Sequence, residues 1–423
     1  MYPNSHDVVP LAARAGLDQY RTHAEDLVEA CKAGAIGQWA SRWPDYADRI
    51  ERFASDTLNR AECAPTAAQY VIARLHGFES WPKFALHLDD LARAASPLSH
   101  FEKAADAVVT GDAATLQQLL REHPALIRAR SSREHRATLL HYVAANGVEN
   151  YRQRTPGNAV AIAGLLLDAG AEVDAEAEIY LGGCTTLGLA ATSIHPEVAG
   201  VQNALMQTLI DRGAIVDHPA GSGSAHSFVA SCLANGRAAA AEYLAAHGAR
   251  LDLEGAAGLG RLDLVAGFFT ADGTLKPPAT DPQLRAGFLW ACEYGRTSVV
   301  EFLLDRGMAA GATLRPDGQT GLHWAALGGR ATVVSLLLAR KAPVDAVENT
   351  YHGTPLNWAL YGWSNAPGTT RDRYYEVISR LVRAGAAVNP AWLDTDAEQT
   401  ALARTLSADA RMLAALRVEP ENL

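Results

Sequence analysis

The sequence has little cysteine, no long apolar run and no local excess of positive charge. Its five cysteines are scattered along 423 residues: Cys31, Cys63, Cys184, Cys232 and Cys292. An odd number of cysteines without metal-ligand spacing is typical of a reducing compartment, so we expect no metal site and a cytoplasmic location. No apolar run is long enough to span a membrane, and the first residues lack the basic-then-apolar pattern of a secretion signal. We therefore expect no membrane partner.

Charge and motifs exclude further classes of function. The net charge of -10 makes nucleic acid a poor partner, because phosphate binding needs a clustered positive face. The most basic segment, residues 373–383, is typical of the solvated side of a helix. The chain has no phosphate-cradling glycine loop, no HExxH or GxSxG motif, and no cysteine with a predictable histidine partner. We expect no cofactor and no catalytic residues, although an enzymatic activity stays open.

Three tryptophans recur at a fixed spacing. Trp290, Trp324 and Trp358 stand 34 residues apart, in the frames FLWACEYG, GLHWAALGG and PLNWALYG. A repeat of this length, rich in small residues where a helix begins, indicates a chain built from stacked helical hairpins.

A short closing phrase recurs in the same register. It reads GAEVD, GAIVD, GARLD and GAAVN at residues 170–174, 213–217, 248–252 and 385–389. Its glycine follows a leucine-rich segment, where a left-handed residue ends a helix without a Cβ penalty. Each hairpin carries apolar residues at helical spacing that it cannot bury alone, so stacking is obligatory.

These features resemble the ankyrin repeat. That family's pattern is a turn, TPLHxAA on a first helix, xVVxLLL on a second helix and GAxVD, and here residues 318–326 read GQTGLHWAA and residues 333–338 read VVSLLL. The resemblance implies an all-α ankyrin-repeat solenoid of helix-turn-helix units with short β-hairpin fingers. It also implies that His141 and His323, at the TPLH histidine position, bond the backbone of the neighbouring hairpin.

The repeats account for most of the chain but not for its ends. We predict an N-terminal helical module at 1–98, an ankyrin-repeat array of about eight units at 99–390, and a C-terminal helical cap at 391–423. The phrase GFESWP at residues 77–82 resembles the helical region that precedes the repeats in a group of bacterial ankyrin proteins. In it, Ser80 is a predicted N-cap with Pro82 in the first turn.

One face of the first helices supplies a first set of candidate binding residues. Three positions at i, i+3 and i+4 spacing share this face, which contributes to the concave surface of an ankyrin array. The candidates are Tyr142, Asn146, Thr192, Trp290, Glu293, Tyr294, Trp324, Trp358 and Tyr361. The tryptophan position usually packs between adjacent helices, so Glu293 and Tyr294 are the stronger candidates.

Insertions supply a second set. Residues 147–158, 193–203 and 362–373 interrupt three units between their helices, and a long finger at 175–186 joins two units. Polar loops on a rigid scaffold often carry binding determinants, although they can also be tolerated surface padding. The candidates here are Glu149, Tyr151, Arg152, Gln153, Tyr180 and His195.

The leading prediction is a non-enzymatic recognition scaffold that binds a protein or peptide partner on its concave face. An alternative is a small-molecule binder or enzyme with a pocket in the concave face between the second and sixth repeats. There Glu293, Tyr294, His195 and Arg152 would act as acid, base or anion-holding groups. A purely structural spacer is a third interpretation.

Overall fold

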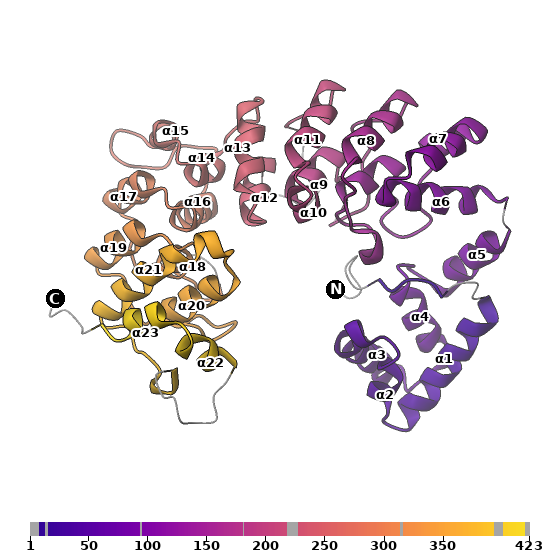
Figure 1. Cartoon of the computed structure of the whole chain (residues 1–423), viewed down its shortest axis with the longest axis horizontal. Helices are drawn as coiled ribbons and strands as arrows, with labels where there is room; N and C mark the ends of the chain where they lie inside the picture. Colours follow the sequence, from indigo (N-terminus) through magenta and orange to yellow (C-terminus); the bar gives the residue numbers. More distant parts are fainter. Residues whose placement is uncertain are drawn as a thin grey trace. The chain divides into compact units, whose positions relative to one another are not determined.

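A computed structural model shows an all-helical chain in which paired helices follow one another (Figure 1). It describes residues 8–12, 16–93, 95–180, 182–217, 227–313, 316–392 and 401–418. Its contacts define two compact units, 1–249 and 250–423. The predicted boundaries at 98 and 390 fall inside these units and stay predictions.

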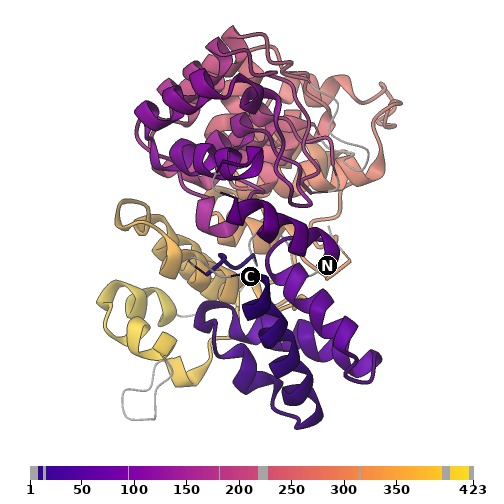
Figure 2. The same ribbon diagram turned by 90° about the vertical axis from the view of Figure 1, so that its right-hand side faces the viewer.

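The first unit begins with five α-helices that share one apolar core. They are α1 (Leu17–Lys32), α2 (Ile36–Ala40), α3 (Ala47–Arg60), α4 (Pro65–Leu75) and α5 (Trp81–Ala92), with the short 3-10 helix η2 (Pro44–Tyr46) before α3. Figures 1 and 2 both show α1 to α4 grouped together. Tyr20, Ile50, Ile72 and Phe84 are among the residues buried in this core. Ser80 is the N-cap of α5 with a proline in the first turn, as predicted, although its side chain accepts no capping hydrogen bond.

A disulfide joins two of the scattered cysteines. Cys31, at the end of α1, is bonded to Cys63, which follows α3. The scattered cysteines were interpreted as typical of a reducing compartment, where a disulfide is not expected. The two cysteines lie 32 residues apart in sequence, and their bond depends on how the helices pack, which cysteine spacing alone does not reveal.

Four helix pairs complete the first unit. They are α6 (Pro97–Thr110) with α7 (Ala113–Glu122), η4 (Leu139–Ala144) with α8 (Ala159–Asp168), α9 (Thr186–Thr192) with α11 (Gln202–Asp211), and α12 (Phe228–Ala234) with α13 (Ala238–Ala246). Shorter helices lie between them: η3 (Pro124–Arg128), η5 (Asn150–Arg152) and α10 (Ile194–Val198). The first helix of the second pair is a 3-10 helix that ends at Ala145 in the left-handed region, with φ 48°. The insertion at 147–158 begins directly after it.

Four more pairs form most of the second unit. They are α14 (Leu253–Leu259) with α15 (Leu262–Gly267), α16 (Asp281–Glu293) with α17 (Thr297–Asp305), α18 (Gly321–Leu327) with α19 (Ala331–Ala339), and α20 (Pro355–Asn365) with α21 (Asp372–Arg383). The insertion at 362–373 extends α20 and adds η6 (Gly368–Thr370). The helices η7 (Pro390–Trp392), α22 (Ala401–Ser407) and α23 (Ala410–Leu416) follow. Of the predicted C-terminal helical cap at 391–423, residues 393–400 and 419–423 lie outside the described residues.

The predicted helix stops are confirmed. Gly170, Gly213, Gly248 and Gly385 all have φ between 90° and 95°. The β-hairpin fingers are less regular than the resemblance implied, because in the described residues they reduce to isolated antiparallel bridges such as Ala177 with Cys184.

The two TPLH histidines have the structural role that the resemblance implied. In His323, Nδ1 accepts a hydrogen bond from the Thr320 N–H at 3.2 Å, and Nε2 lies 3.2 Å from the carbonyl oxygen of Gly353 in the next repeat. His141 makes the same pair of bonds, to Thr138 and Cys184. Because Nδ1 accepts, the ring is neutral with its proton on Nε2. Each histidine therefore caps its own helix and ties it to the next hairpin.

In the second unit, side chains also close the C-terminal ends of the first helices. The last carbonyls of a helix lack partners within the helix. Here Arg296 Nε donates to the Gly258 oxygen at 2.9 Å and Arg330 Nε to the Glu293 oxygen at 2.7 Å. The Tyr374 hydroxyl donates to the Leu327 oxygen at 2.7 Å. Each donor comes from the repeat that follows, so each helix end is completed by its successor.

Among the described residues, no helix is both long enough and apolar enough to cross a membrane.

Candidate functional site

The three predicted tryptophans form a continuous row in the second unit. The ring centroids of Trp290 and Trp324 are 5.8 Å apart, those of Trp324 and Trp358 are 5.2 Å apart, and both contacts are edge-to-face. Such contacts stabilise aromatic pairs by about 0.5–1.5 kcal/mol beyond the area they bury. We call Trp290, Trp324 and Trp358 the tryptophan row.

Exposure changes along the tryptophan row. Trp290 is 3% exposed and its Nε1 donates to Glu254 at 2.7 Å, so it is a packing residue, and the prediction that it contacts a partner is wrong. Trp324 and Trp358 are half-buried. Tyr361, one turn beyond Trp358 on α20, is 65% exposed. The row therefore runs from the core to an open aromatic surface.

The hairpin before α20 is shaped to receive the Trp358 ring. The buried carboxylate of Glu348 accepts backbone N–H groups from Thr350, Tyr351 and Gly353. These hydrogen bonds lower the pKa of Glu348 although burial alone would raise it. A Cβ on Gly353 would lie 3.1 Å from the Trp358 ring, which is closer than ordinary contact. Only glycine lets the ring lie against this loop without displacement.

The two candidates one turn beyond Trp290, Glu293 and Tyr294, are half-buried at the end of α16. The structure therefore leaves part of each side chain accessible. Their binding role stays a prediction.

Three candidates of the first unit meet in one hydrogen-bonded group. The Tyr180 hydroxyl donates to Asn146 Oδ1 at 2.7 Å, and Asn146 Nδ2 donates to Thr192 Oγ1 at 3.1 Å. Tyr180 comes from the finger and the other two from successive repeats, so the group joins three segments. Tyr180 is 53% exposed and forms its outer part.

The insertion at 147–158 is buried rather than displayed. Glu149 and Arg152 are 0% and 4% exposed. Arg133 Nη1 lies 2.8 Å from both Glu102 and Glu149, and Arg152 Nη1 lies 2.8 Å from Glu102 and 3.3 Å from Glu149. We call these four residues the charge cluster. It joins α6, the loop after η3 and the insertion.

Two tyrosines complete the charge cluster. The buried Tyr142 hydroxyl donates to Glu149 Oε1 at 3.3 Å, and Arg133 Nη2 donates to the Tyr151 hydroxyl at 3.2 Å. Burial raises the pKa of Tyr151 to about 12. Burial alone would also raise the pKa of Glu149, but Arg133 and Arg152 hold it well below its usual range. All four charges of the cluster are therefore present near neutral pH.

These positions correct part of the predicted binding surface. Tyr142, Glu149, Arg152 and Gln153 were expected to face a partner, but each is at most 6% exposed. Gln153 donates to the Val148 oxygen at 2.6 Å, inside its own insertion. Arg152 binds Glu102 on α6, and Glu149 binds Arg133 in the loop after η3. A polar insertion that looks like a surface loop is therefore buried inside the first unit. Tyr151 and His195 are half-buried.

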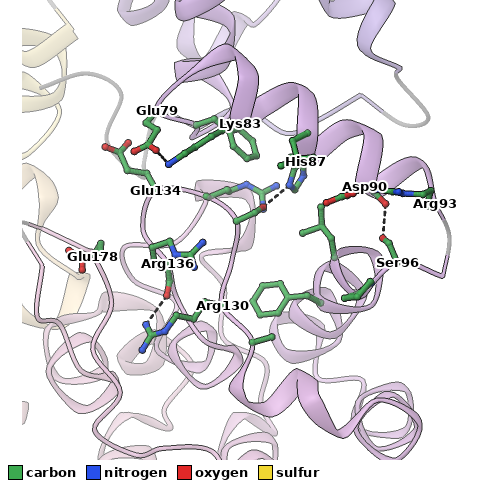
Figure 3. A pocket seen from close by; sticks show the side chains of 18 of the residues that line it. Glu79, Lys83, His87, Asp90, Arg93, Ser96, Arg130, Glu134, Arg136 and Glu178 are labelled. Carbon is green, nitrogen blue, oxygen red and sulfur yellow. Dashed lines mark hydrogen bonds and ion pairs between the residues drawn. The ribbon is translucent and has the colours of Figure 1, made fainter.

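A cavity of about 1680 Å³ lies beside the charge cluster in the first unit (Figure 3). Its walls come from α5, the start of α6 and the loop at 129–136, with Glu178 and Gly182 from the finger. We call it the α5 cavity. Apart from the phrase GFESWP and the finger, these segments were not singled out in the sequence, because they do not match the repeat pattern. The nearest signal is the charged phrase SSREHR at 131–136.

One wall of the α5 cavity contains a buried histidine. His87 Nδ1 is 2.7 Å from Ser132 Oγ, and burial lowers the pKa of His87 to about 4. Its Nε2 is buried and has no hydrogen-bond partner among the described residues. An imidazole with so low a pKa is a weak proton acceptor at neutral pH. This pair therefore fixes the loop against α5 and is a poor candidate for nucleophilic catalysis.

Comparisons with known proteins agree with the repeats. Residues 288–391 match the family described as ankyrin repeats in three copies. Among solved structures, the human ASB11 ankyrin repeat domain is 20% identical, and the match covers 59% of this chain and 99% of that chain with a TM-score of 0.28. A TM-score this low supports no conclusion about arrangement or partner. No curated protein matches the chain. The protein is thus an all-helical chain that contains ankyrin repeats, with three copies matched between residues 288 and 391.

Proposed function

We propose that this protein is a recognition scaffold whose second unit binds an extended segment of a partner protein. The contact surface consists of Trp324, Trp358 and Tyr361, with Glu293 and Tyr294 beside it. Ankyrin repeats are protein-interaction modules, and the predicted concave first-helix face contains these residues. The observation that carries the proposal is the increase in exposure from Trp290, at 3%, through the half-buried Trp324 and Trp358 to Tyr361, which lies one turn beyond Trp358 on α20 and is 65% exposed.

Exposing the Tyr361 ring to water costs free energy that a packing residue avoids. A packing residue would be expected to turn its ring toward the core, as Trp290 does. Tyr361 instead leaves most of its ring in water, next to Trp358 on the same helix face. Aromatic rings offer a large contact area at little conformational entropy, which is why they dominate binding surfaces. A row anchored at its buried end is also rigid before binding.

The test is selection of random peptides of about 12 residues on the full chain, followed by affinity measurement for the selected sequences. Tyr361→Ala and Trp358→Phe should weaken those that bind the tryptophan row by about tenfold or more. Tyr70→Ala is the matched control, because Tyr70 is also an exposed tyrosine, at 41%, but lies on α4 in the first unit.

The proposal is contradicted if no selected peptide loses affinity for Tyr361→Ala or Trp358→Phe. Circular dichroism and thermal unfolding of each variant establish that it is folded. Tyr361→Ala removes an exposed ring and should leave the unfolding temperature within about 2 °C of the parent.

The alternative of a small-molecule or enzymatic pocket between the second and sixth repeats stays a prediction. The bacterial origin and the cytoplasmic location also stay predictions.

A further inference from the structure

The α5 cavity has the dimensions of a binding site for a chain segment rather than for a single metabolite. Small-molecule sites usually enclose about 300–1,000 Å³. The α5 cavity measures about 1680 Å³, and several residues on its walls are exposed to solvent. An extended peptide fills such a space without being enclosed by it.

The positive charges on the cavity wall differ in how they are compensated. Lys83 pairs with Glu79 and Arg93 pairs with Asp90. The third compensated cation, Arg133, belongs to the charge cluster. These groups have carboxylate partners, so they offer little attraction for a further anion.

Arg130 and Arg136 have no such partner. Arg130 Nη1 donates to the carbonyl oxygens of Arg136 and Glu176, at 3.0 and 2.6 Å, and Arg136 Nη1 donates to the Ser131 oxygen at 3.1 Å. Neither forms an ion pair with any described residue. Both are exposed, and Figure 3 shows them next to each other at one end of the cavity. A guanidinium has five N–H donors, so most of theirs remain available to a carboxylate.

Negative charge on the cavity wall does not cancel this pair. Glu134 is bonded to Arg74 on α4. Glu178 reaches the wall from the finger, and Figure 3 shows it apart from Arg136 and Arg130, with which it forms no ion pair. The anion-binding part of the cavity is therefore local to the two arginines.

The same cavity has an apolar part. Leu86 on α5 is 61% exposed, and Pro97 and Leu98 at the start of α6 also line the space. An exposed leucine and two further apolar residues on the same cavity favour contact with an apolar side chain. One ligand that spans the cavity would meet both this part and the arginines.

We propose that the α5 cavity is a second binding site, which takes a peptide segment of a partner protein that carries an acidic side chain close to an apolar one. The acidic group binds Arg130 and Arg136, and the apolar group packs on Leu86, Pro97 and Leu98. The charge complementarity of an acidic segment with two uncompensated guanidinium groups selects this occupant. The site lies wholly in the first unit, and it does not depend on the tryptophan row.

The experiment selects random peptides of about 12 residues on the full chain and sorts them by loss of binding to Arg130→Gln/Arg136→Gln. The sorted peptides should be enriched in Asp or Glu near Leu, Ile or Phe. Leu86→Ser should weaken their binding by about tenfold. Arg128→Gln is the matched control, because Arg128 is exposed in the same segment but does not line the cavity.

A double-mutant cycle separates direct contact from a loss of folding. Replacing the acidic residue of a selected peptide by its amide should weaken binding to the parent chain about tenfold, and should have little effect on binding to Arg130→Gln/Arg136→Gln. Equal effects on both proteins, or sorted peptides without acidic residues, would overturn the proposal. So would competition by inorganic phosphate that displaces acidic and amide peptides alike, since that indicates a free-anion site.

Trp358→Phe separates the two sites. Binding of the acidic peptides should be unchanged in this variant, whereas peptides bound at the tryptophan row should be weakened. If the experiment contradicts one of the two proposed sites, the other site can still be tested with its own variants. Acidic peptides that depend on Trp358 as well as on Arg136 would contradict the assignment to the α5 cavity.

Discussion

In the first unit, buried charged side chains hold neighbouring segments together. In the second unit, tryptophan rings of successive repeats do so. The charge cluster holds the insertion at 147–158 against α6 through four buried ionic groups. The tryptophan row spans three regular repeats through ring contacts. Ring contacts tolerate small movements and are insensitive to pH. Buried ions need every partner in place, because an unpaired buried charge costs several kcal/mol.

Acidification should produce the largest difference between the units. Burial lowers the pKa of His76 to about 3 and of His87 and His141 to about 4, from an ordinary 6.5. In the unfolded chain these rings bind protons near pH 6.5, so their contribution to stability is complete above that pH and declines as the pH falls toward 4. Glu102 and Glu149, whose pKa values are lowered by the arginines despite burial, lose their contribution below about 4.5.

Hydrogen exchange resolved by peptide, at neutral pH and near pH 4.5, measures this difference once intrinsic exchange rates are corrected. The first unit should lose protection and the second should retain most of it. In the described part of the second unit, His323 is the one histidine with a lowered pKa. Equal loss of protection in both units would contradict the contrast.

Arg133→Ala should have the next largest effect. It leaves Glu102 and Glu149 buried with one arginine between them, and the loss of a buried partner costs about 3–5 kcal/mol of unfolding free energy. The control is Arg340→Ala in the second unit, where a partly exposed arginine pairs with Asp305 and less than about 1 kcal/mol is expected. Denaturant unfolding measures both. Similar losses would show that the charge cluster contributes no more than a surface ion pair.

Reduction of the Cys31–Cys63 disulfide should destabilise the first unit alone. The bond closes a loop across 32 residues, and its removal is expected to lower stability by about 2–4 kcal/mol. Cys31→Ser/Cys63→Ser should reproduce the loss and remove the sensitivity to dithiothreitol. Protection in residues 17–75, followed by hydrogen exchange, is the measurement. A loss of protection confined to repeats of the second unit would be inconsistent with this expectation.

Gly353→Ala tests the tryptophan row at its exposed end. The added Cβ displaces the Trp358 ring, with an expected cost of about 1–3 kcal/mol. The tryptophan fluorescence of the second unit should shift to longer wavelength as the ring gains water contact. Gly368→Ala is the control, because a Cβ there meets nothing within 4 Å. Identical spectra for the two variants would mean that the loop accommodates the methyl group without moving the ring.

The sequence allowed the repeat architecture to be predicted because its signals are local. A glycine that ends a helix, such as Gly213, and a threonine and histidine that cap one, such as Thr320 and His323, act within a few residues of themselves. The tryptophan spacing also predicted the register correctly, and Trp290 to Trp358 lie in contact as a row.

The candidate sites were predicted less well because their chemistry depends on partners far away in sequence. Arg152 looked like a surface residue because its partner Glu102 lies 50 residues earlier, in a repeat without the consensus pattern. The α5 cavity was missed for the same reason. Arg136 and Leu86 line the same cavity only because the loop after η3 packs near α5.

In the second unit, the hydrogen bonds that cap the C-terminal ends of the first helices come from the repeat that follows in sequence. The repeats therefore depend on one another in one direction along the chain. The carbonyl oxygen of Gly258 accepts a hydrogen bond from Arg296, that of Glu293 from Arg330 and that of Leu327 from Tyr374. Each donor belongs to a repeat that is synthesised later. A repeat leaving the ribosome therefore keeps an open carbonyl until its successor emerges. Truncation at the C-terminal side removes the donor from the last of these helices that remains, whereas truncation at the N-terminal side leaves the bonds of the later repeats intact.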